Sequence, residues 1–318
     1  MPGAPAIVAV CLMGPTATGK TDLAMALAER LPLGLVSVDS AMVYRYLDIG
    51  SGKPVPDVLA RYPHRLVDIR DPWEQYSAGE FAADASQVIR DISAAGRIPL
   101  LVGGTFLYFR SLVQGLADLP AADPALRAEL EARAAREGWP ALHAELARFD
   151  PAAAARIGAT DRQRIQRALE VRLLTGQPIS ALQARPAAGE RGSFFRIGLL
   201  PRDRPALAER IALRFQGMLE RGFIDEVERL LSLPEMHTDR PALRAVGYRQ
   251  IAQFVGGRCT RAEAERQALA ATRQLAKRQL TWLRREACDL WLDVEADDLP
   301  GTLEQAVRGM LPRMQCQP

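Results

Sequence analysis

Apolar and polar positions alternate along the first hundred residues in blocks that favour strands followed by helices. Three short, strongly apolar runs predict buried strands: residues 7–13, 35–38 and 98–102. Apolar residues spaced three and four apart predict two helices: residues 21–30 and 80–95. Strands that alternate with helices in this way form a parallel sheet with helices on both faces. The sequence therefore predicts an α/β fold.

The pattern changes between residues 118 and 191, where no strand-like run occurs. This stretch is rich in Ala, Arg and Glu and is interrupted by five prolines: Pro120, Pro124, Pro140, Pro151 and Pro178. Strand character returns at 194–200 and again at 290–294. We therefore expect an α/β core formed by residues 1–117 and 192–318, and an all-helical insertion domain formed by residues 118–191.

Composition adds little to this picture. Hydrophobic residues make up 48% and charged residues 25% of the 318 positions, as is ordinary for a soluble globular protein. The cysteines are far apart and suggest neither a disulfide framework nor a zinc site: Cys11, Cys259, Cys288 and Cys316. The apolar run 7–13 lacks a basic leader and is too short to span a membrane. We expect a soluble, cytoplasmic monomer without membrane contact.

The basic residues are almost all arginine. The net charge of +3 is too small to indicate a nucleic-acid partner, but only three of the 41 basic residues are lysines: Lys20, Lys53 and Lys277. Those positions are candidates for a specific role, although chance can produce the same pattern. Lys53 lies in a glycine turn, 50–54, and alone is weak evidence. The three histidines, His64, His143 and His237, are scattered and read as structural or exposed.

The segment 14–21 carries the strongest motif. Its sequence, Gly-Pro-Thr-Ala-Thr-Gly-Lys-Thr, satisfies the P-loop pattern and lies between a predicted strand and a predicted helix. Glycines let backbone N–H groups converge on phosphate oxygens, and the helix N-terminus adds a partial positive charge. Lys20 supplies a point charge and Thr21 can hold Mg²⁺. The motif predicts a phosphate site, without separating a nucleotide from another diphosphate.

Two further strand ends meet the same edge of the sheet. Asp39 and Ser40 end the second predicted strand and face the crevice beside the P-loop. A carboxylate there can accept a proton from a nucleophile, but it can also cap a helix or bind a magnesium-bound water. Gly103 and Gly104, followed by Thr105, end the third strand, where glycines are equally typical of a tight turn that needs their dihedral freedom.

Two helical segments have features suited to nucleic acid. In 161–174, Gln163, Gln166 and Arg167 share one face opposite Ile165, which suits phosphate and base-edge contacts or simply a solvated face. In 266–285, basic residues recur near one stripe without matching acids: Arg266, Arg273, Lys277 and Arg284. Such a stripe favours a phosphate backbone.

The helix that carries the basic stripe is expected to begin after Thr260, with Glu263 completing a capping box. Trp282, at helical spacing on the same helix, is more typical of a core than of a base-stacking residue.

Three functions come into consideration. A P-loop kinase would use ATP, with Asp39 activating a substrate hydroxyl and the helical insertion as its lid. A nucleotide-driven RNA-binding switch would need a γ-phosphate sensor, which we cannot locate. The third function, a transferase that acts on tRNA, comes from the family resemblance described next and would use both the P-loop and the basic stripe.

The motifs in order resemble those of the tRNA dimethylallyltransferase (tRNA isopentenyltransferase) family of bacteria. The resemblance runs from the P-loop to about Glu286 and is carried by eight segments: 14–21, 39–45, 47–54, 63–68, 103–108, 161–170, 244–249 and 277–284. It implies a P-loop NTPase-like core, transfer of a dimethylallyl group from dimethylallyl diphosphate to N6 of adenosine 37 in tRNA, and Mg²⁺ as cofactor. The helical insertion would bind the anticodon stem-loop.

The resemblance also implies roles for single residues, with Asp39 as general base and Arg214 acting on the diphosphate beside Lys20 and Thr21. The diphosphate would be held by Gly14, Pro15, Thr16, Ala17, Thr18, Gly19, Lys20 and Thr21, with Thr21 on the metal. The implied tRNA contacts are Asp39, Ser40, Ala41, Met42, Thr105, Arg127, Gln163, Arg164, Ile165, Gln166, Arg167, Arg244, Ala245, Val246, Gly247, Tyr248, Arg249, Lys277, Arg278, Gln279, Leu280, Thr281, Trp282, Leu283 and Arg284.

Departures from the family pattern are few. Met42 stands where many members carry Gln, so a side-chain amide contact with the adenine is not implied. Ala245 replaces a common Cys, and Ser51-Gly52 replaces Thr-Ala. No zinc-finger segment follows Glu286.

Overall fold

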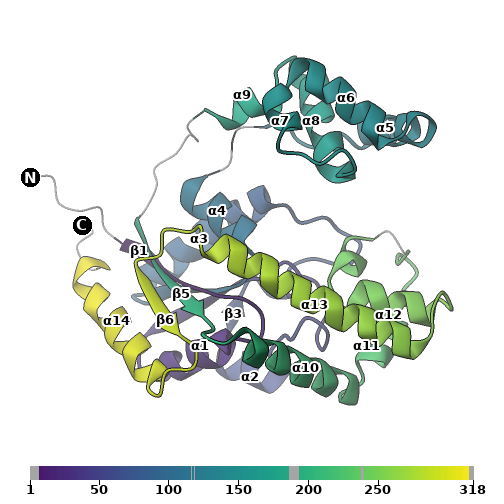
Figure 1. Cartoon of the computed structure of the whole chain (residues 1–318). Coiled ribbons are helices and arrows are strands. Elements are labelled where there is room, and N and C mark those ends of the chain that lie inside the picture. Colours follow the sequence, from purple (N-terminus) through teal and green to yellow (C-terminus); the bar gives the residue numbers. More distant parts are fainter. Residues whose placement is uncertain (1–6, 116, 118, 186–192, 238–239, 315–318) are drawn as a thin grey trace, which may run out of the picture. The chain divides into compact units, whose positions relative to one another are not determined.

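The computed structural model describes residues 7–115, 117, 119–185, 193–237 and 240–314. Its centre is a six-stranded sheet (Figure 1). Every pairing is parallel, and the strand order is β3-β2-β4-β1-β5-β6. The strands are β1 (Ile7–Met13), β2 (Leu33–Val38), β3 (His64–Arg65), β4 (Ile98–Gly103), β5 (Ser193–Leu200) and β6 (Leu290–Asp293). The predicted α/β fold with a parallel sheet is confirmed. The two-residue strand β3 was not predicted, because so short a run has no periodicity to read.

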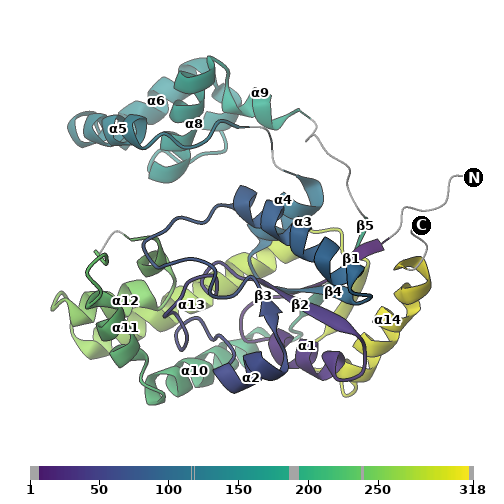
Figure 2. The same ribbon diagram turned by 180° about the vertical axis from the view of Figure 1, so that it is seen from behind.

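Helices cover both faces of the sheet (Figure 2). The helices of the core are α1 (Lys20–Ala28), α2 (Pro56–Arg61), α3 (Ala78–Ala94), α4 (Phe106–Gln114), α10 (Arg204–Glu220), α11 (Phe223–Leu231), the 3₁₀ helix η1 (Pro241–Arg244), α12 (Tyr248–Val255), α13 (Arg261–Leu283) and α14 (Leu299–Met314). Alternate residues of β1 show the two-sided burial. Cys11 packs with α3, α4 and the end of α13, whereas Leu12 packs with α1 and α14.

The order of the strands creates a crevice next to β1. The chain leaves β1, forms β2 away from it, returns to fill the gap with β4, and later adds β5 on the other side of β1. In such sheets ligands bind outside the carboxyl ends of the strands where the direction of winding changes. The loops after β1, β2 and β4 therefore meet at one place.

Two helix starts differ from expectation. Thr260 caps α13 through a 3.3 Å bond to the Glu263 amide, but the Glu263 side chain accepts a bond from Gln267, so no capping box forms. A complete box instead begins α3, where Ser77 and Glu80 bond each other's backbone amides.

The chain divides into two compact units, Met1–Val113 with Gly192–Pro318 and Gln114–Arg191. The described residues of the second unit form helices and no strand: α5 (Pro124–Glu137), α6 (Trp139–Phe149), α7 (Pro151–Ala154), α8 (Arg162–Thr175) and α9 (Ile179–Gln183). It has its own apolar core around Leu130, Leu142 and Ile165. Prolines stand at the starts of four of these helices, as their fixed φ and missing N–H favour.

Candidate active site

The P-loop connects β1 to α1 and is shaped to bind an anion. Ala17 and Gly19 adopt left-handed backbone conformations, with φ of 64° and 74°, and alternating right- and left-handed residues turn successive N–H groups towards one point. The Thr18 hydroxyl donates to the Pro15 carbonyl at 2.8 Å and closes the loop internally. A side chain at Gly14 would press on Leu199 and on the Thr18 hydroxyl, both 3.1 Å from its Cβ position. The loop is thus packed from behind and open towards the crevice.

Lys20 lies within this loop rather than extending into solvent. Its ammonium group donates to the Pro15 carbonyl and, at 3.4 Å, to the Thr18 hydroxyl. Burial and the nearby Arg214 charge lower the pKa of Lys20 to about 7, while Asp39 acts in the opposite direction. An anion in the loop would remove this penalty, because it favours the charged form.

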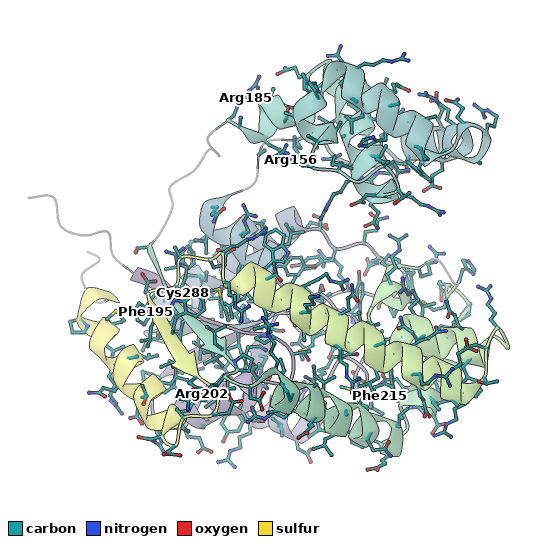
Figure 3. All side chains as sticks on the ribbon, in the orientation of Figure 1. Arg156, Arg185, Phe195, Arg202, Phe215 and Cys288 are labelled. Carbon is teal, nitrogen blue, oxygen red and sulfur yellow. The ribbon has the colours of Figure 1, made fainter. Side chains whose placement is uncertain are left out.

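Arg214 comes from α10 and meets the P-loop from the other side. Its Nη1 donates to the Thr16 hydroxyl at 2.9 Å and its Nη2 to the Ser51 carbonyl at 3.4 Å. Burial lowers the pKa of Arg214, and Asp39 partly offsets this effect. Phe215, labelled on α10 in Figure 3, is buried in the core next to it and fixes this turn of the helix.

Asp39 lies directly after β2, as the sequence predicts. Its Oδ1 accepts the amides of Ala41 at 2.8 Å and Met42 at 3.2 Å, which fixes the turn that follows. Its Oδ2 takes no hydrogen bond from the residues that the structure describes, and its charge is felt by both Lys20 and Arg214. One carboxylate oxygen of Asp39 thus caps the turn, and the other has no hydrogen bond among the described residues.

The turn after β4 completes this edge of the sheet. The Ser40 amide donates to the Thr105 hydroxyl at 3.1 Å, so the ends of β2 and β4 are joined. Gly103 and Gly104 do not have positive φ values, so the alternative of a tight turn that needs left-handed dihedrals does not apply. They are needed for space: a Cβ at Gly103 would lie 2.1 Å from the Val38 carbonyl oxygen, and one at Gly104 would lie 2.4 Å from Gln279.

Gln279 of α13 is part of the P-loop environment. Its Oε1 accepts the Thr16 amide at 2.9 Å and its Nε2 donates to the Gly104 carbonyl at 3.0 Å. The side chain joins α13 to the P-loop and to the turn after β4, and its expected contact with tRNA stays a prediction.

Lys53 is also structural. The side chain is buried, and its ammonium group is bound by Asp48 at 2.6 Å, Asp68 at 2.5 Å and the Tyr44 carbonyl at 3.1 Å. Lys53, one of the three lysines of the chain, therefore stabilises the loop around residues 44–53. The sequence reading missed its counterpart Glu226, a buried acid on α11 that bonds the same loop. The sequence does carry a signal for Glu226, because this acid falls on the apolar face of a helix together with Phe223 and Val227.

The outer face of α13 is basic, as expected. Five exposed basic residues lie along α13 and at its C-cap: Arg266, Arg273, Lys277, Arg278 and Arg284. In the described part of the chain none of these five has a carboxylate partner within 4 Å, whereas Arg261 pairs with Glu265 at 2.7 Å. Trp282 packs against the core and carries Arg110 over its ring at 5.1 Å, which agrees with the expected core position.

A pocket of about 380 Å³ opens beside this face. Its lining residues are Arg244, Val246, Arg249, Gln250, Ala270, Ala271, Gln274 and Arg278. Three arginines and two amides with no acid give a concave surface for an anionic, hydrogen-bonding ligand.

The helical unit presents a second set of cations. Glu170 is fully buried and accepts Arg127 Nε at 2.8 Å, Arg167 Nη1 at 2.7 Å and the Asp123 amide at 2.8 Å. Gln163 and Arg164 are exposed on α8, the helix that carries Arg167 and Glu170. The two arginines therefore are held in fixed directions by one internal acid.

Four of the implied tRNA contacts have no side-chain surface to offer. Ile165 lies in the core of the helical unit, and Tyr248, Leu280 and Leu283 lie in apolar cores of the other unit. Their side chains are buried because the segments that carry them are amphipathic and turn every third or fourth residue inward, and their contacts with tRNA stay predictions.

The histidines behave as expected: His64 and His143 bond backbone carbonyls, and His237 is exposed. Among the described residues no group of three His, Cys, Asp or Glu is arranged to hold a metal. Cys11, Cys259 and Cys288 are free thiols, and Cys316 lies outside the described residues. No helix in the described ranges is long and apolar enough to cross a bilayer.

A P-loop that follows the central strand β1 of a parallel sheet, with the Asp39 carboxylate at the end of β2 on the same edge, defines a P-loop phosphate-binding enzyme. Family comparison is more specific. The chain belongs to the IPP transferase family, whose model matches residues 42–286, and an isopentenyl transferase model matches residues 7–70.

Similar proteins agree over nearly the whole chain. The tRNA dimethylallyltransferase of Burkholderia ambifaria is 54% identical over 95% of this chain and 96% of its own length. That of Stenotrophomonas maltophilia (strain R551-3) is 56% identical over 91% and 93%. Among solved structures, the tRNA isopentenylpyrophosphate transferase of Bacillus halodurans superposes with a TM-score of 0.69 at 35% identity, covering 96% of this chain and 97% of that one.

Proposed function

We propose that this chain transfers a dimethylallyl group from dimethylallyl diphosphate to N6 of adenosine 37 in tRNA and releases diphosphate. The observation that carries the proposal is the position of Asp39 directly after β2, where its carboxylate charge acts on the half-buried cations Lys20 and Arg214 at the P-loop. A base and an anion site in one crevice fit a nucleophile that attacks carbon while a diphosphate leaves.

The reaction needs a base because N6 of adenine is a poor nucleophile whose lone pair is delocalised into the ring. As N6 forms a bond to the allylic carbon, the bond from that carbon to the diphosphate oxygen breaks. The N6 proton passes to Asp39 Oδ2, since Oδ1 already accepts two amides. General-base help of this kind contributes roughly 10²–10⁴-fold.

The leaving diphosphate gains negative charge, which the P-loop amides, Lys20 and Arg214 would stabilise in place. The residues present also fit Mg²⁺. Thr21 lies in the first turn of α1 beside Lys20, and magnesium typically takes one or two protein oxygens together with phosphate oxygens and water. When bound, the ion would neutralise diphosphate charge, with Thr21 as its protein ligand.

The tRNA would lie against the basic face of α13 and the pocket beside it. A target base must leave its stack, which costs a few kcal/mol, and contacts to the splayed loop offset that cost. The pocket of about 380 Å³, with Arg244, Arg249 and Arg278 in its wall, has the chemistry of a site for one such nucleotide. The exposed arginines of α13 would bind phosphates along the strand.

The helical unit would bind the anticodon stem-loop through Arg127, Gln163, Arg164 and Arg167. Its arginines leave a guanidinium edge exposed while Glu170 fixes their direction. A chain that acts on tRNA works in the cytoplasm, and nothing in the proposal requires a second copy of it.

The kinase alternative uses the same P-loop, with ATP as donor. It gives no role to the basic face of α13, and it does not explain membership of a prenyl-transferring family.

One labelling experiment tests the proposal. Dimethylallyl diphosphate labelled in its hydrocarbon part, or ATP labelled in its γ-phosphate, is incubated with tRNA and Mg²⁺. We expect only the hydrocarbon label in the tRNA, and none in a tRNA with guanosine at position 37. Transfer of the phosphate label would overturn the proposal and favour a kinase.

A further inference from the structure

Glu226 is a buried acid whose role is not accounted for by the reaction itself. It is 5% exposed and lies in the first turn of α11. Its Oε2 accepts the amides of Asp48 at 3.1 Å and Ile49 at 2.6 Å, and its Oε1 accepts the Gly50 amide at 3.0 Å. The Tyr248 hydroxyl also donates to Oε1, at 2.6 Å. Within the described residues no lysine, arginine or histidine pairs with this carboxylate.

Three consecutive amides therefore converge on one internal anion. This is the arrangement by which backbone turns bind phosphate, but here the protein supplies the anion itself. A buried charge is tolerated only when hydrogen bonds satisfy it, and four of them do so here. The loop 48–52 is thereby fixed from within the fold.

The far side of the same loop contacts Arg214. The Ser51 carbonyl accepts Arg214 Nη2 at 3.4 Å, while the Ser51 amide donates to Tyr248 at 3.1 Å. Gly52, with φ of 70°, leaves space that the guanidinium occupies, since a Cβ there would lie 1.8 Å from Nη2. The other end of the guanidinium, Nη1, reaches Thr16 of the P-loop.

We propose that Glu226 is a positioning residue for the transfer reaction: it fixes the loop 48–52 so that Arg214 is directed at the leaving diphosphate. Glu226 touches no substrate and acts through Arg214. The inference rests on the proposed function, because it gives Arg214 its task.

Chemistry explains why a carboxylate is required. Its two oxygens accept three N–H groups and one hydroxyl. A glutamine has one oxygen, so in either orientation its NH₂ would face at least one backbone N–H. The loop would have to move, and Ser51 would move with it.

The test is a double-mutant cycle of Glu226→Gln and Arg214→Ala, with Glu304→Gln as the control. Glu304 is a glutamate of the same unit that pairs with Arg30 and Arg308 at the surface. Transfer kinetics are measured with varied dimethylallyl diphosphate, and tRNA affinity is measured separately. We expect Glu226→Gln to lower kcat/KM for the diphosphate about tenfold, with tRNA affinity and the control unchanged. In the Arg214→Ala background the same change has no further effect.

An equal loss in both backgrounds would overturn the inference, as would a Glu226→Gln protein with ordinary kinetics. If Glu226→Gln does not fold, as judged by circular dichroism, Tyr248→Phe replaces it. That variant removes the hydroxyl that bonds both Glu226 and Ser51, and its loss must likewise vanish in the Arg214→Ala background. Failure of the proposed function looks different, since transfer would be absent from the unaltered protein or Arg214→Ala would leave diphosphate kinetics unchanged.

Discussion

The P-loop crevice and the outer face of α13 are both cationic, but they hold their charges in opposite ways. In the crevice Lys20 and Arg214 are bonded to loop oxygens, and burial lowers the pKa of each. On α13 the arginines are exposed and have no acid partner among the described residues within 4 Å, apart from Arg261. The first arrangement fixes charge at one point, and the second spreads charge along a surface.

The placement of the charges determines what kind of ligand each region can recognise. Hydrogen-bond donors that are held in fixed positions strongly stabilise negative charge that develops next to them, because they do not have to reorient during the reaction. Exposed cations attract any phosphate backbone and are screened by salt. Single substitutions in the crevice should therefore change the chemical step greatly, whereas substitutions on α13 should change binding in small, additive amounts.

The largest effect is expected for Asp39→Asn. Asparagine keeps an oxygen for the amides of Ala41 and Met42 but has no charge to accept a proton. We expect kcat to fall roughly 10²–10⁴-fold while tRNA affinity stays within about twofold. Single-turnover transfer and filter binding measure the two quantities. A variant with ordinary turnover would exclude Asp39 as the base.

Lys20→Ala should come next. Loss of a fixed cation from the anion site should reduce kcat/KM for dimethylallyl diphosphate about 10²–10³-fold. Steady-state kinetics at saturating tRNA measure the change, and tRNA affinity serves as the control. Unaltered diphosphate kinetics would show that the P-loop is not where the leaving group binds.

Neutralising three cations of α13 should have a moderate effect. We expect Lys277→Gln, Arg278→Gln and Arg284→Gln together to weaken tRNA binding about tenfold at moderate salt and to flatten the dependence on salt concentration. Arg261→Gln is the matched control, because Arg261 lies on the same helix but is paired with Glu265. An unchanged salt slope in the triple variant would remove α13 from the tRNA interface.

A smaller effect should follow from pH. The pKa of Lys20 lies near 7 in the free protein, and a bound diphosphate raises it, so binding above pH 7 requires proton uptake. Affinity for the diphosphate should be greatest below pH 7 and decline as pH rises, by about fivefold between pH 7 and 8. Titration of diphosphate binding checks this, and Lys20→Ala should abolish the decline. An affinity that is flat across this range in the unaltered protein contradicts the assignment.

The sequence predicted the sheet and the P-loop well because both follow from local patterns. Strands such as Leu33–Val38 are continuous apolar runs, and the P-loop glycines are adjacent in the chain. The contact of Gln279 with the P-loop and the role of Glu226 were not predicted, since the hydrogen-bond partners of these side chains lie 263 and 176–178 positions away. Their roles depend on which loops the fold brings together, and the local spacing of apolar and polar residues does not predict such contacts.

Segment motifs also misled at single positions. Within 277–284 the exposed Lys277 and the buried Leu283 share one motif, although only the former can reach a ligand. Helical geometry separates them, so a contact carried over from a family is best weighed residue by residue against burial.

In the proposed reaction the P-loop holds a diphosphate that leaves, rather than a nucleotide that is consumed. The most direct test of this proposal is the stoichiometry of inorganic diphosphate released per dimethylallyl group transferred to tRNA, measured with Mg²⁺ and without ATP. We expect one diphosphate to be released for each dimethylallyl group transferred. Transfer that depends on ATP, or that yields orthophosphate in place of diphosphate, would contradict the proposal.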